Sequence, residues 1–173
     1  VDGVWVAPAL GRDARPPTSP VPVVKRQLPW TPAPLAPYVR GALGLPDDFV
    51  FLFACDYRSA SARKNPVGLI EAFKAAFPPG SGASLVLKTI NGENLPHEHE
   101  RVLMAAGDHP DIHFINRYVS APEKDALLAA CDCYVSLHRS EGFGLTPAEA
   151  MYFGRPVIAT GYGGVLEFMT AEN

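Results

Sequence analysis

Two glutamates around a glycine-rich loop form the segment of this sequence with the clearest chemical potential. Glu141 and Glu149 are separated by seven residues, and Gly142 and Gly144 lie between them. Glycine allows a backbone to approach a ligand closely because it carries no Cβ. Thr146-Pro147 is a typical helix start, with Thr as the N-cap and Pro in the first turn. Since free N–H groups at a helix start favour anions, the segment predicts a phosphate-binding loop flanked by two carboxylates.

Two adjacent cations lie upstream, immediately before a run with the apolar spacing of a helix. These are Arg63 and Lys64. Positive charge at a helix start is unfavourable against the helix dipole. Their position therefore indicates a nearby anion, with a pair of solvated charges as the alternative.

Alternating strand and helix patterns would position these residues. Short apolar runs predict buried strands, and apolar residues at helical spacing predict the helices between them. This alternation is typical of an α/β fold with a doubly wound parallel sheet. We expect strands at 49–54, 84–88, 112–115, 133–137 and 156–160, and helices at 66–77, 96–107, 122–131, 146–153 and 164–169.

Candidate ligand residues follow several of these expected strands. In a doubly wound sheet, ligands bind beyond the carboxyl ends of the strands. Lys88 comes at the end of the second expected strand, Arg117 and Tyr118 follow the third, and His138 follows the fourth. For His138, a structural hydrogen bond to the backbone is the alternative.

Composition excludes several classes of protein. The chain has 173 residues, a net charge of −3, 47% hydrophobic residues and 19% charged residues. A folded core is therefore expected, and the lack of a basic surplus disfavours a general nucleic-acid binder. No apolar run approaches the roughly 20 residues of a membrane-spanning helix. Three cysteines are too few for a disulfide framework and fit a reducing, cytoplasmic compartment.

Two longer stretches resemble one known family. EGFGLTPAEAM at 141–151, followed by GRPVIAT at 154–160, resembles the retaining GT-B glycosyltransferases of the glycogen-synthase-like, or group 1, family. RKNP at 63–66 and LIEAF at 69–73 are similar to a bacterial subgroup with mannosyltransferase-like members. The resemblance extends over roughly residues 49–169. It implies the Rossmann-like C-terminal half of a two-domain enzyme, the half that binds a nucleotide-sugar donor.

The resemblance also implies roles for the charged residues. Glu141 would bind a hydroxyl of the donor sugar and, with Lys64, form the catalytic pair. Glu149 would accept hydrogen bonds from the ribose hydroxyls. Glu149 is also three residues after Thr146, so a capping box is the alternative explanation for it.

The rest of the expected donor site consists of cations and backbone groups. Lys64 would hold the diphosphate together with Arg58 or Arg63, because Ser59 occupies the place where the family usually has an arginine. The other expected donor-binding positions are Lys88, His138, Gly142, Phe143, Gly144 and Leu145.

No cofactor and no metal are expected. Sugar transfer leaves negative charge on the departing diphosphate, and cations with a helix N-terminus can stabilise that charge without a divalent ion. The sequence has no Asp-x-Asp pair. Residues 97–100, HEHE, are interpreted as a solvated helix face, and Cys131 and Cys133 as buried structural thiols.

The predicted organisation follows from the same resemblance. Residues 1–20 are expected to be a remnant of an N-terminal acceptor domain and its connector. Residues 21–173 would be the donor domain, truncated at its C-terminus. The expected partners are a nucleoside-diphosphate sugar and the missing N-terminal domain, with peripheral membrane association possible for the full-length protein. The isolated chain is expected to be inactive, because the GT-B active site lies between two domains.

The predicted function is transfer of a sugar from a nucleoside-diphosphate sugar to a saccharide or lipid-linked glycan acceptor, as in polysaccharide biosynthesis. Two alternatives remain open. One is a sugar-nucleotide epimerase with the same fold. The other is a degenerate, non-catalytic nucleotide-binding α/β module.

Overall fold

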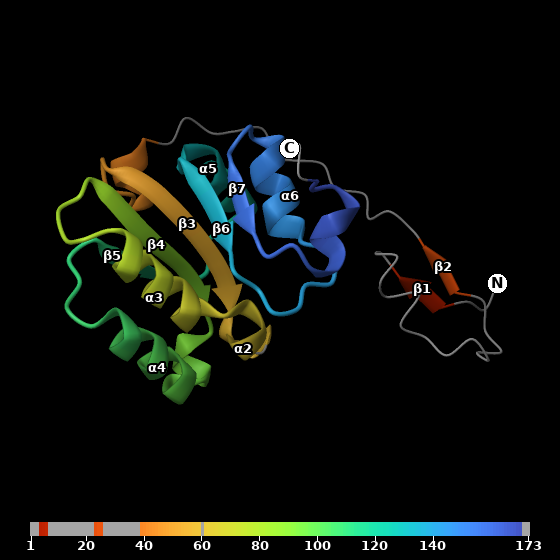
Figure 1. Cartoon of the computed structure of the whole chain (residues 1–173), viewed down its shortest axis with the longest axis horizontal. Coiled ribbons are helices and arrows are strands. Elements are labelled where there is room, and N and C mark those ends of the chain that lie inside the picture. The colour runs from red at the N-terminus through yellow and green to blue at the C-terminus, as the bar shows by residue number, and fades with distance from the viewer. Residues whose placement is uncertain (1–3, 7–22, 26–38, 60, 171–173) are drawn as a thin grey trace.

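The computed structural model of the protein describes residues 4–6, 23–25, 39–59 and 61–170 (Figure 1). Its central element is a five-stranded parallel sheet in the order β5-β4-β3-β6-β7. The strands of this sheet are β3 (Phe49–Asp56), β4 (Ala83–Ile90), β5 (Ile112–Asn116), β6 (Cys133–Ser136) and β7 (Val157–Ala159).

Helices cover both faces of the sheet. α3 (Pro66–Ala76) and α4 (Pro96–Ala106) pack on one face, which is turned towards the viewer in Figure 1. α5 (Ala121–Ala130) and α6 (Leu145–Tyr152) pack on the opposite face. The predicted doubly wound α/β fold is therefore confirmed. Short helical turns complete the described segments: η1 (Arg40–Leu43), η2 (Tyr57–Ser59), α2 (Ser61–Lys64), η3 (Gly92–Asn94) and η4 (Gly163–Glu167).

The central strand β3 contributes to two hydrophobic cores because its side chains alternate between the two faces. Phe53 joins the cluster under α3 and α4, where it lies with Phe73. Leu52 joins the cluster under α5 and α6, where it lies with Leu127. Burial on both faces explains why this strand is a nearly continuous apolar run in the sequence.

The strand order changes direction next to β3. The chain proceeds from β3 to β4 to β5 on one side, and then crosses to β6 and β7 on the other side. β6 pairs with β3 through Phe51↔Cys133 and Leu52↔Tyr134. The loops that follow β3 and β6 therefore begin next to each other at the edge of the sheet and then run in different directions. Such a switch point opens a crevice at the carboxyl ends of the strands.

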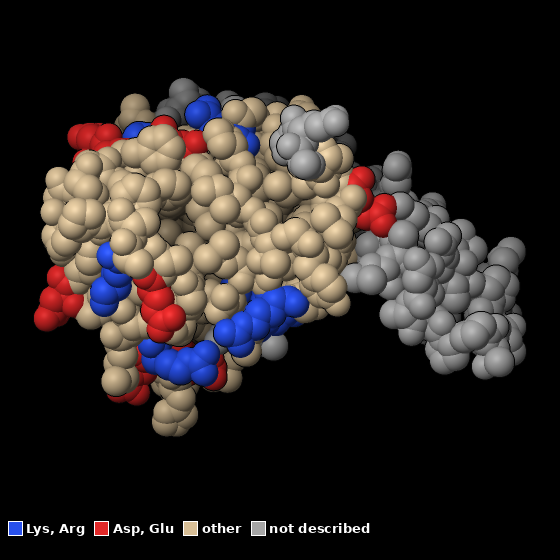
Figure 2. Space-filling model, viewed as in Figure 1, with Lys and Arg blue, Asp and Glu red and all other residues tan. Residues whose placement is uncertain are grey.

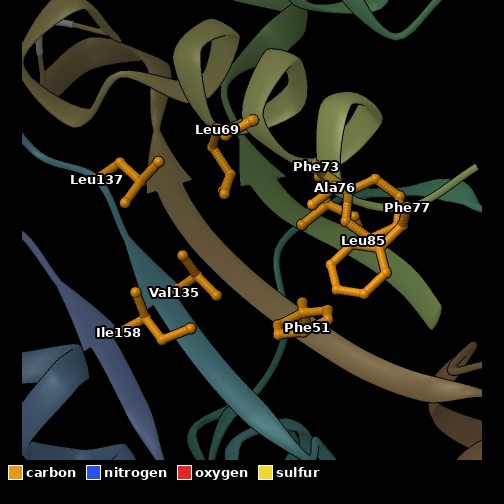
Figure 3. Close-up of a pocket in the computed structure, with 10 residues that line it drawn as sticks. Phe51, Leu69, Phe73, Ala76, Phe77, Leu85, Val135, Leu137 and Ile158 are labelled. Carbon is orange, nitrogen blue, oxygen red and sulfur yellow. The ribbon is translucent and has the colours of Figure 1, made fainter.

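A separate apolar hollow of about 190 Å³ lies on the sheet face that carries α3 (Figure 3). Phe51, Phe77, Val135 and Ile158 are among the side chains that line it. All of its lining residues are apolar, so it offers no side-chain partner for a polar ligand. The candidate site lies elsewhere.

Several predicted element boundaries need correction. The expected strand 84–88 extends to Ile90, so Lys88 lies within β4 rather than beyond it. The expected helix 164–169 is instead the 3₁₀ turn η4. Arg63 and Lys64 do not begin a helix, because they end the separate turn α2 while α3 starts at Pro66.

At the N-terminal end, two short strands pair in parallel. They are β1 (Val4–Val6) and β2 (Val23–Lys25). This pairing joins a segment of the expected remnant, residues 1–20, to one from the expected donor domain. Most of residues 1–38 lies outside the described residues, and the division at residue 20 stays a prediction.

Candidate functional site

A cavity of about 540 Å³ opens at the carboxyl ends of the central strands. Its volume is in the range of small-molecule sites. Three lysines from three different elements line it: Lys64 of α2, Lys88 of β4 and Lys124 of α5. Thr146, at the start of α6, lines it as well. A pocket with three ammonium groups beside a helix N-terminus is suited to an anionic ligand.

The ion pair between Lys64 and Glu141 links the loops after β3 and β6. Both side chains are largely buried, with 14% and 11% of their surfaces exposed. The other carboxylate oxygen of Glu141 accepts the backbone N–H of Gly142 at 3.1 Å. Burial raises the pKa of Glu141, but the hydrogen bond and charge of Lys64, with the charge of Arg63, outweigh burial and lower that pKa below its usual 4.5. Glu141 is therefore ionised at neutral pH.

The two candidate arginines lie outside the cavity lining. Arg63 donates to the carbonyls of Ser59 at 3.2 Å and Ser140 at 3.0 Å, and lies 3.4 Å from Glu141. Arg63 thus joins α2 to the loop after β6. Arg58 is exposed, and its backbone N–H donates to Asp56 at 2.9 Å. Among the candidate diphosphate cations, Lys64 is the one that reaches the cavity.

Glu149 is buried and forms an ion pair with Lys124, which lines the cavity. Its Oε1 lies 2.6 Å from the Nζ of Lys124, and the residue is 6% exposed. The alternative capping-box role is wrong, because the N-cap of α6 is Gly144, two residues before Thr146. Glu149 is therefore five residues into the helix and faces α5 rather than its own N-cap.

Lys124 was missed by the sequence reasoning. The signal for it was indirect. The hydroxyl of Ser120 accepts the N–H of Glu123 at 3.3 Å and so caps α5, the helix that contains Lys124. The N-terminus of a helix after a parallel strand lies at the carboxyl edge of the sheet. A lysine four residues after such a cap could therefore have been placed near the cavity.

The loop before α6 adopts its shape through glycine. Gly144 has a φ of 89°, a conformation that other residues rarely adopt. No side chain caps the helix that follows. The η4 turn packs directly on this loop, where Gly164 donates its N–H to the carbonyl of Glu141 at 2.9 Å. A Cβ on Gly164 would lie 2.1 Å from the carbonyl oxygen of Gly142. The backbone of residues 141–145 is thus supported from behind by close backbone packing.

His138 uses both ring nitrogens inside the protein. It is 1% exposed. Nδ1 lies 3.0 Å from the hydroxyl of Ser136, and Nε2 lies 2.9 Å from the carbonyl of Tyr162. These bonds fit the structural alternative for this residue, and its expected donor contact stays a prediction.

The far end of the cavity is formed by the ends of β4 and β5. Lys88 is 7% exposed, and its ammonium donates to the carbonyl of Thr89 at 3.1 Å and to that of Arg117. Burial and the nearby Arg117 lower the pKa of Lys88. The Tyr118 hydroxyl donates to Asn91 at 2.7 Å, which holds the tyrosine at the cavity rim.

Charged side chains of both signs lie along the lower edge of the face shown in Figure 2, and a group of Lys and Arg side chains lies where β3 ends and α2 lies in Figure 1. Among the described residues, no three His, Cys, Asp or Glu side chains form a group that could hold a metal ion. No helix in the described part of the chain is long and apolar enough to cross a membrane.

A family model and several known proteins match this chain. The model for glycosyl transferases, group 1, matches residues 43–173. A trehalose synthase of Rubrobacter xylanophilus is 31% identical over 114 residues, which cover 62% of this chain and 27% of that protein. The lipopolysaccharide core biosynthesis mannosyltransferase LpsB of Rhizobium meliloti is 37% identical over 94 residues, covering 53% of this chain and 26% of that protein.

Solved structures show the same fold. HepE of Anabaena in complex with UDP and glucose superposes with a TM-score of 0.59 at 26% identity, covering 76% of this chain and 34% of that one. Sucrose-phosphate synthase of Thermosynechococcus elongatus superposes with a TM-score of 0.68 at 24% identity, covering 94% of this chain and 41% of that one. The chain thus spans about a quarter of the length of the curated relatives named above.

Proposed function

Because the chain belongs to the glycosyl transferases group 1 family, we propose that it supplies the donor-binding part of a retaining glycosyltransferase. One observation carries this proposal. A single cavity at the switch point of the sheet is lined by Lys64 and Lys124, and these lysines pair with Glu141 and Glu149. A nucleoside-diphosphate sugar has a dianionic centre with hydroxyl groups on both sides. The two lysines complement the negative charge of the diphosphate, and the carboxylates next to them complement the hydroxyl groups on its two sides.

Lys64 is the proposed partner of the diphosphate. An ammonium group has three N–H donors, and Glu141 occupies one of them in this structure. The remaining donors can bind phosphate oxygens. As the bond between the sugar and the diphosphate breaks, negative charge grows on the departing diphosphate. Lys64 and the N–H groups at the start of α6 then interact more strongly with the transition state than with the bound donor.

The two glutamates are the proposed acceptors for hydroxyl groups. Glu141 is ionised and pairs with Lys64, so it would accept a hydroxyl of the donor sugar next to the diphosphate. Glu149 pairs with Lys124, which lines the cavity, and would accept the ribose hydroxyls. Lys64 and Lys124 would supply the positive charge for the diphosphate, so the proposed transfer needs no divalent cation.

The names of the relatives favour a hexose as the transferred group. They include mannosyltransferases and trehalose synthases, and HepE was solved with UDP and glucose. We propose a saccharide or lipid-linked glycan as the acceptor. Acceptor binding would require the part of the relatives that this chain does not span. The 173-residue chain should therefore bind a nucleotide without catalysing transfer.

Calorimetric titration of the chain with UDP, GDP, ADP and CDP tests the proposal. We expect at least one nucleotide to bind. Lys64→Ala and Glu149→Ala should each weaken it by about 10- to 100-fold, the equivalent of one hydrogen bond to a charged group. Arg101→Ala is the matched control, because Arg101 is an exposed cation on α4 away from the cavity. The donor-binding role is refuted if none of the four nucleotides binds at millimolar concentration.

A further inference from the structure

The cavity has two chemically different ends. At the end between β3 and β6, Lys64 is neutralised by its ion pair with Glu141. At the other end, between β4 and β5, the hydrogen-bond partners of Lys88 among the described residues are neutral carbonyl groups. The two lysines come from different elements, α2 and β4, and both line the cavity. An elongated ligand would meet them with different parts of its structure.

The geometry around Lys88 leaves one donor available to a ligand. Two of its three N–H groups bond to the carbonyls of Thr89 and Arg117, and among the described residues no third acceptor contacts its ammonium. Both partners are backbone atoms at the ends of paired strands, so the nitrogen is held in place rather than swinging freely. Lys88 also lines the cavity although it is 7% exposed. The remaining N–H therefore meets a ligand inside the cavity.

The surroundings of Lys88 suit a flat ring. Ile90 and Val119 supply apolar surface, and Tyr118 supplies an aromatic ring. The Tyr118 hydroxyl is held by Asn91, whose amide in turn donates to Asp56 at 2.7 Å. Arg117 directs its guanidinium to Glu123 and presents only its carbonyl to Lys88. An aromatic side chain fixed in this way is a stacking surface for a heterocyclic base.

We propose that Lys88 recognises the nucleobase of the donor by donating a hydrogen bond to the C4 carbonyl oxygen of uracil or the C6 carbonyl oxygen of guanine, and thereby selects UDP- or GDP-linked sugars against CDP- or ADP-linked ones. This inference rests on the proposed donor-binding function. Uracil and guanine carry a carbonyl oxygen where cytosine and adenine carry an amino group. An amino group would place a donor against the remaining N–H of Lys88, so a buried donor would stay unsatisfied.

Matched nucleotide pairs test this inference. UDP and CDP share a pyrimidine ring, and GDP and ADP share a purine ring, so each pair differs in the keto or amino group without a change in ring size. Titration calorimetry should show UDP binding at least about 10-fold tighter than CDP, or GDP at least about 10-fold tighter than ADP. Lys88→Met, which keeps most of the length of the side chain without its donors, should bring the ratio of the two affinities in each pair close to one.

Lys74→Met is the matched control. Lys74 likewise donates to two backbone carbonyls, those of Ala105 and Ala106, but it does so between α3 and α4, away from the cavity. This control variant should leave the affinity ratios of UDP to CDP and of GDP to ADP unchanged. Inorganic pyrophosphate should bind the wild type and Lys88→Met equally, because the diphosphate belongs to the Lys64 end.

The outcomes separate this inference from the proposed function. If the wild type binds UDP and CDP equally, and GDP and ADP equally, base recognition by Lys88 is overturned while donor binding stays intact. The same conclusion follows if a folded Lys88→Met variant keeps the wild-type ratio of affinities. If none of the four nucleotides binds, the donor-binding function itself fails and the inference fails with it. The wild-type ratio needs no substitution, so it tests the inference even if Lys88→Met does not fold.

Discussion

The ion pair between Lys64 and Glu141 should stabilise the protein even when no ligand is bound. The two side chains are 14% and 11% exposed, so each loses most of its hydration in the folded state. Removing one partner of a fully buried pair costs about 3–5 kcal/mol. Lys64→Met leaves Glu141 with Arg63 at 3.4 Å and the N–H of Gly142 at 3.1 Å, which offset part of this loss. We therefore expect a decrease of about 2 kcal/mol in the free energy of unfolding.

A double-mutant cycle isolates the pair itself. Urea unfolding of the wild type, Lys64→Met, Glu141→Gln and the double variant should give a coupling energy of about 1–2 kcal/mol at pH 7. The control is the same cycle on Arg101 and Glu98, which lie 3.8 Å apart with 55% and 39% of their side chains exposed. An exposed pair of this kind should couple by about 0.3 kcal/mol. Equal coupling in the two cycles would refute the argument from burial.

The same cycle should depend on pH in a defined direction. Burial acts to raise the pKa of Glu141, but its contacts with Lys64 and Arg63 lower it overall in the folded protein. A carboxylate with a depressed folded pKa contributes stability above its unfolded pKa, near 4.5, and loses that contribution as the pH falls through the folded value. The coupling energy should therefore be constant above about pH 5 and decline towards acid. A coupling energy that grows on acidification would contradict the assignment of Glu141 as the ionised partner.

Two further predictions concern the loop and the thiols. Gly164→Ala should destabilise the protein by about 1–3 kcal/mol and weaken nucleotide binding, because its Cβ would overlap the carbonyl of Gly142, whereas Gly161→Ala has open space and should be neutral; equal unfolding midpoints in urea would contradict this packing. Burial raises the pKa of Cys55 and of Cys131 to about 12, so both thiols should resist iodoacetamide at pH 8 in the folded protein and react after unfolding in urea. Mass spectrometry would detect the alkylation. Rapid reaction of either thiol in the native protein would contradict its buried position.

Much of the fold follows from local patterns in the sequence. Apolar runs such as 49–54 predict buried strands because both faces of a parallel strand meet helices. The boundary errors arise where backbone geometry overrides residue preference. Thr146 is a favourable N-cap by type, yet α6 begins earlier because Gly144 adopts a left-handed conformation against Val165 and Phe168. A contact with a residue about 20 positions away leaves no local signal.

The sequence by itself determined the alternation of elements, the loop after β6 and the residue types around it, because these depend on local periodicity and on short motifs. Only the tertiary structure decided which charges meet. Lys64 pairs with Glu141, and Lys124 pairs with Glu149, because the crossover from β5 to β6 brings distant loops to one edge of the sheet. The same packing turned Arg63 towards backbone carbonyls and His138 into the interior. Side-chain direction depends on neighbours that lie close in space and far apart in the chain, and so it could not be taken from the order of residues.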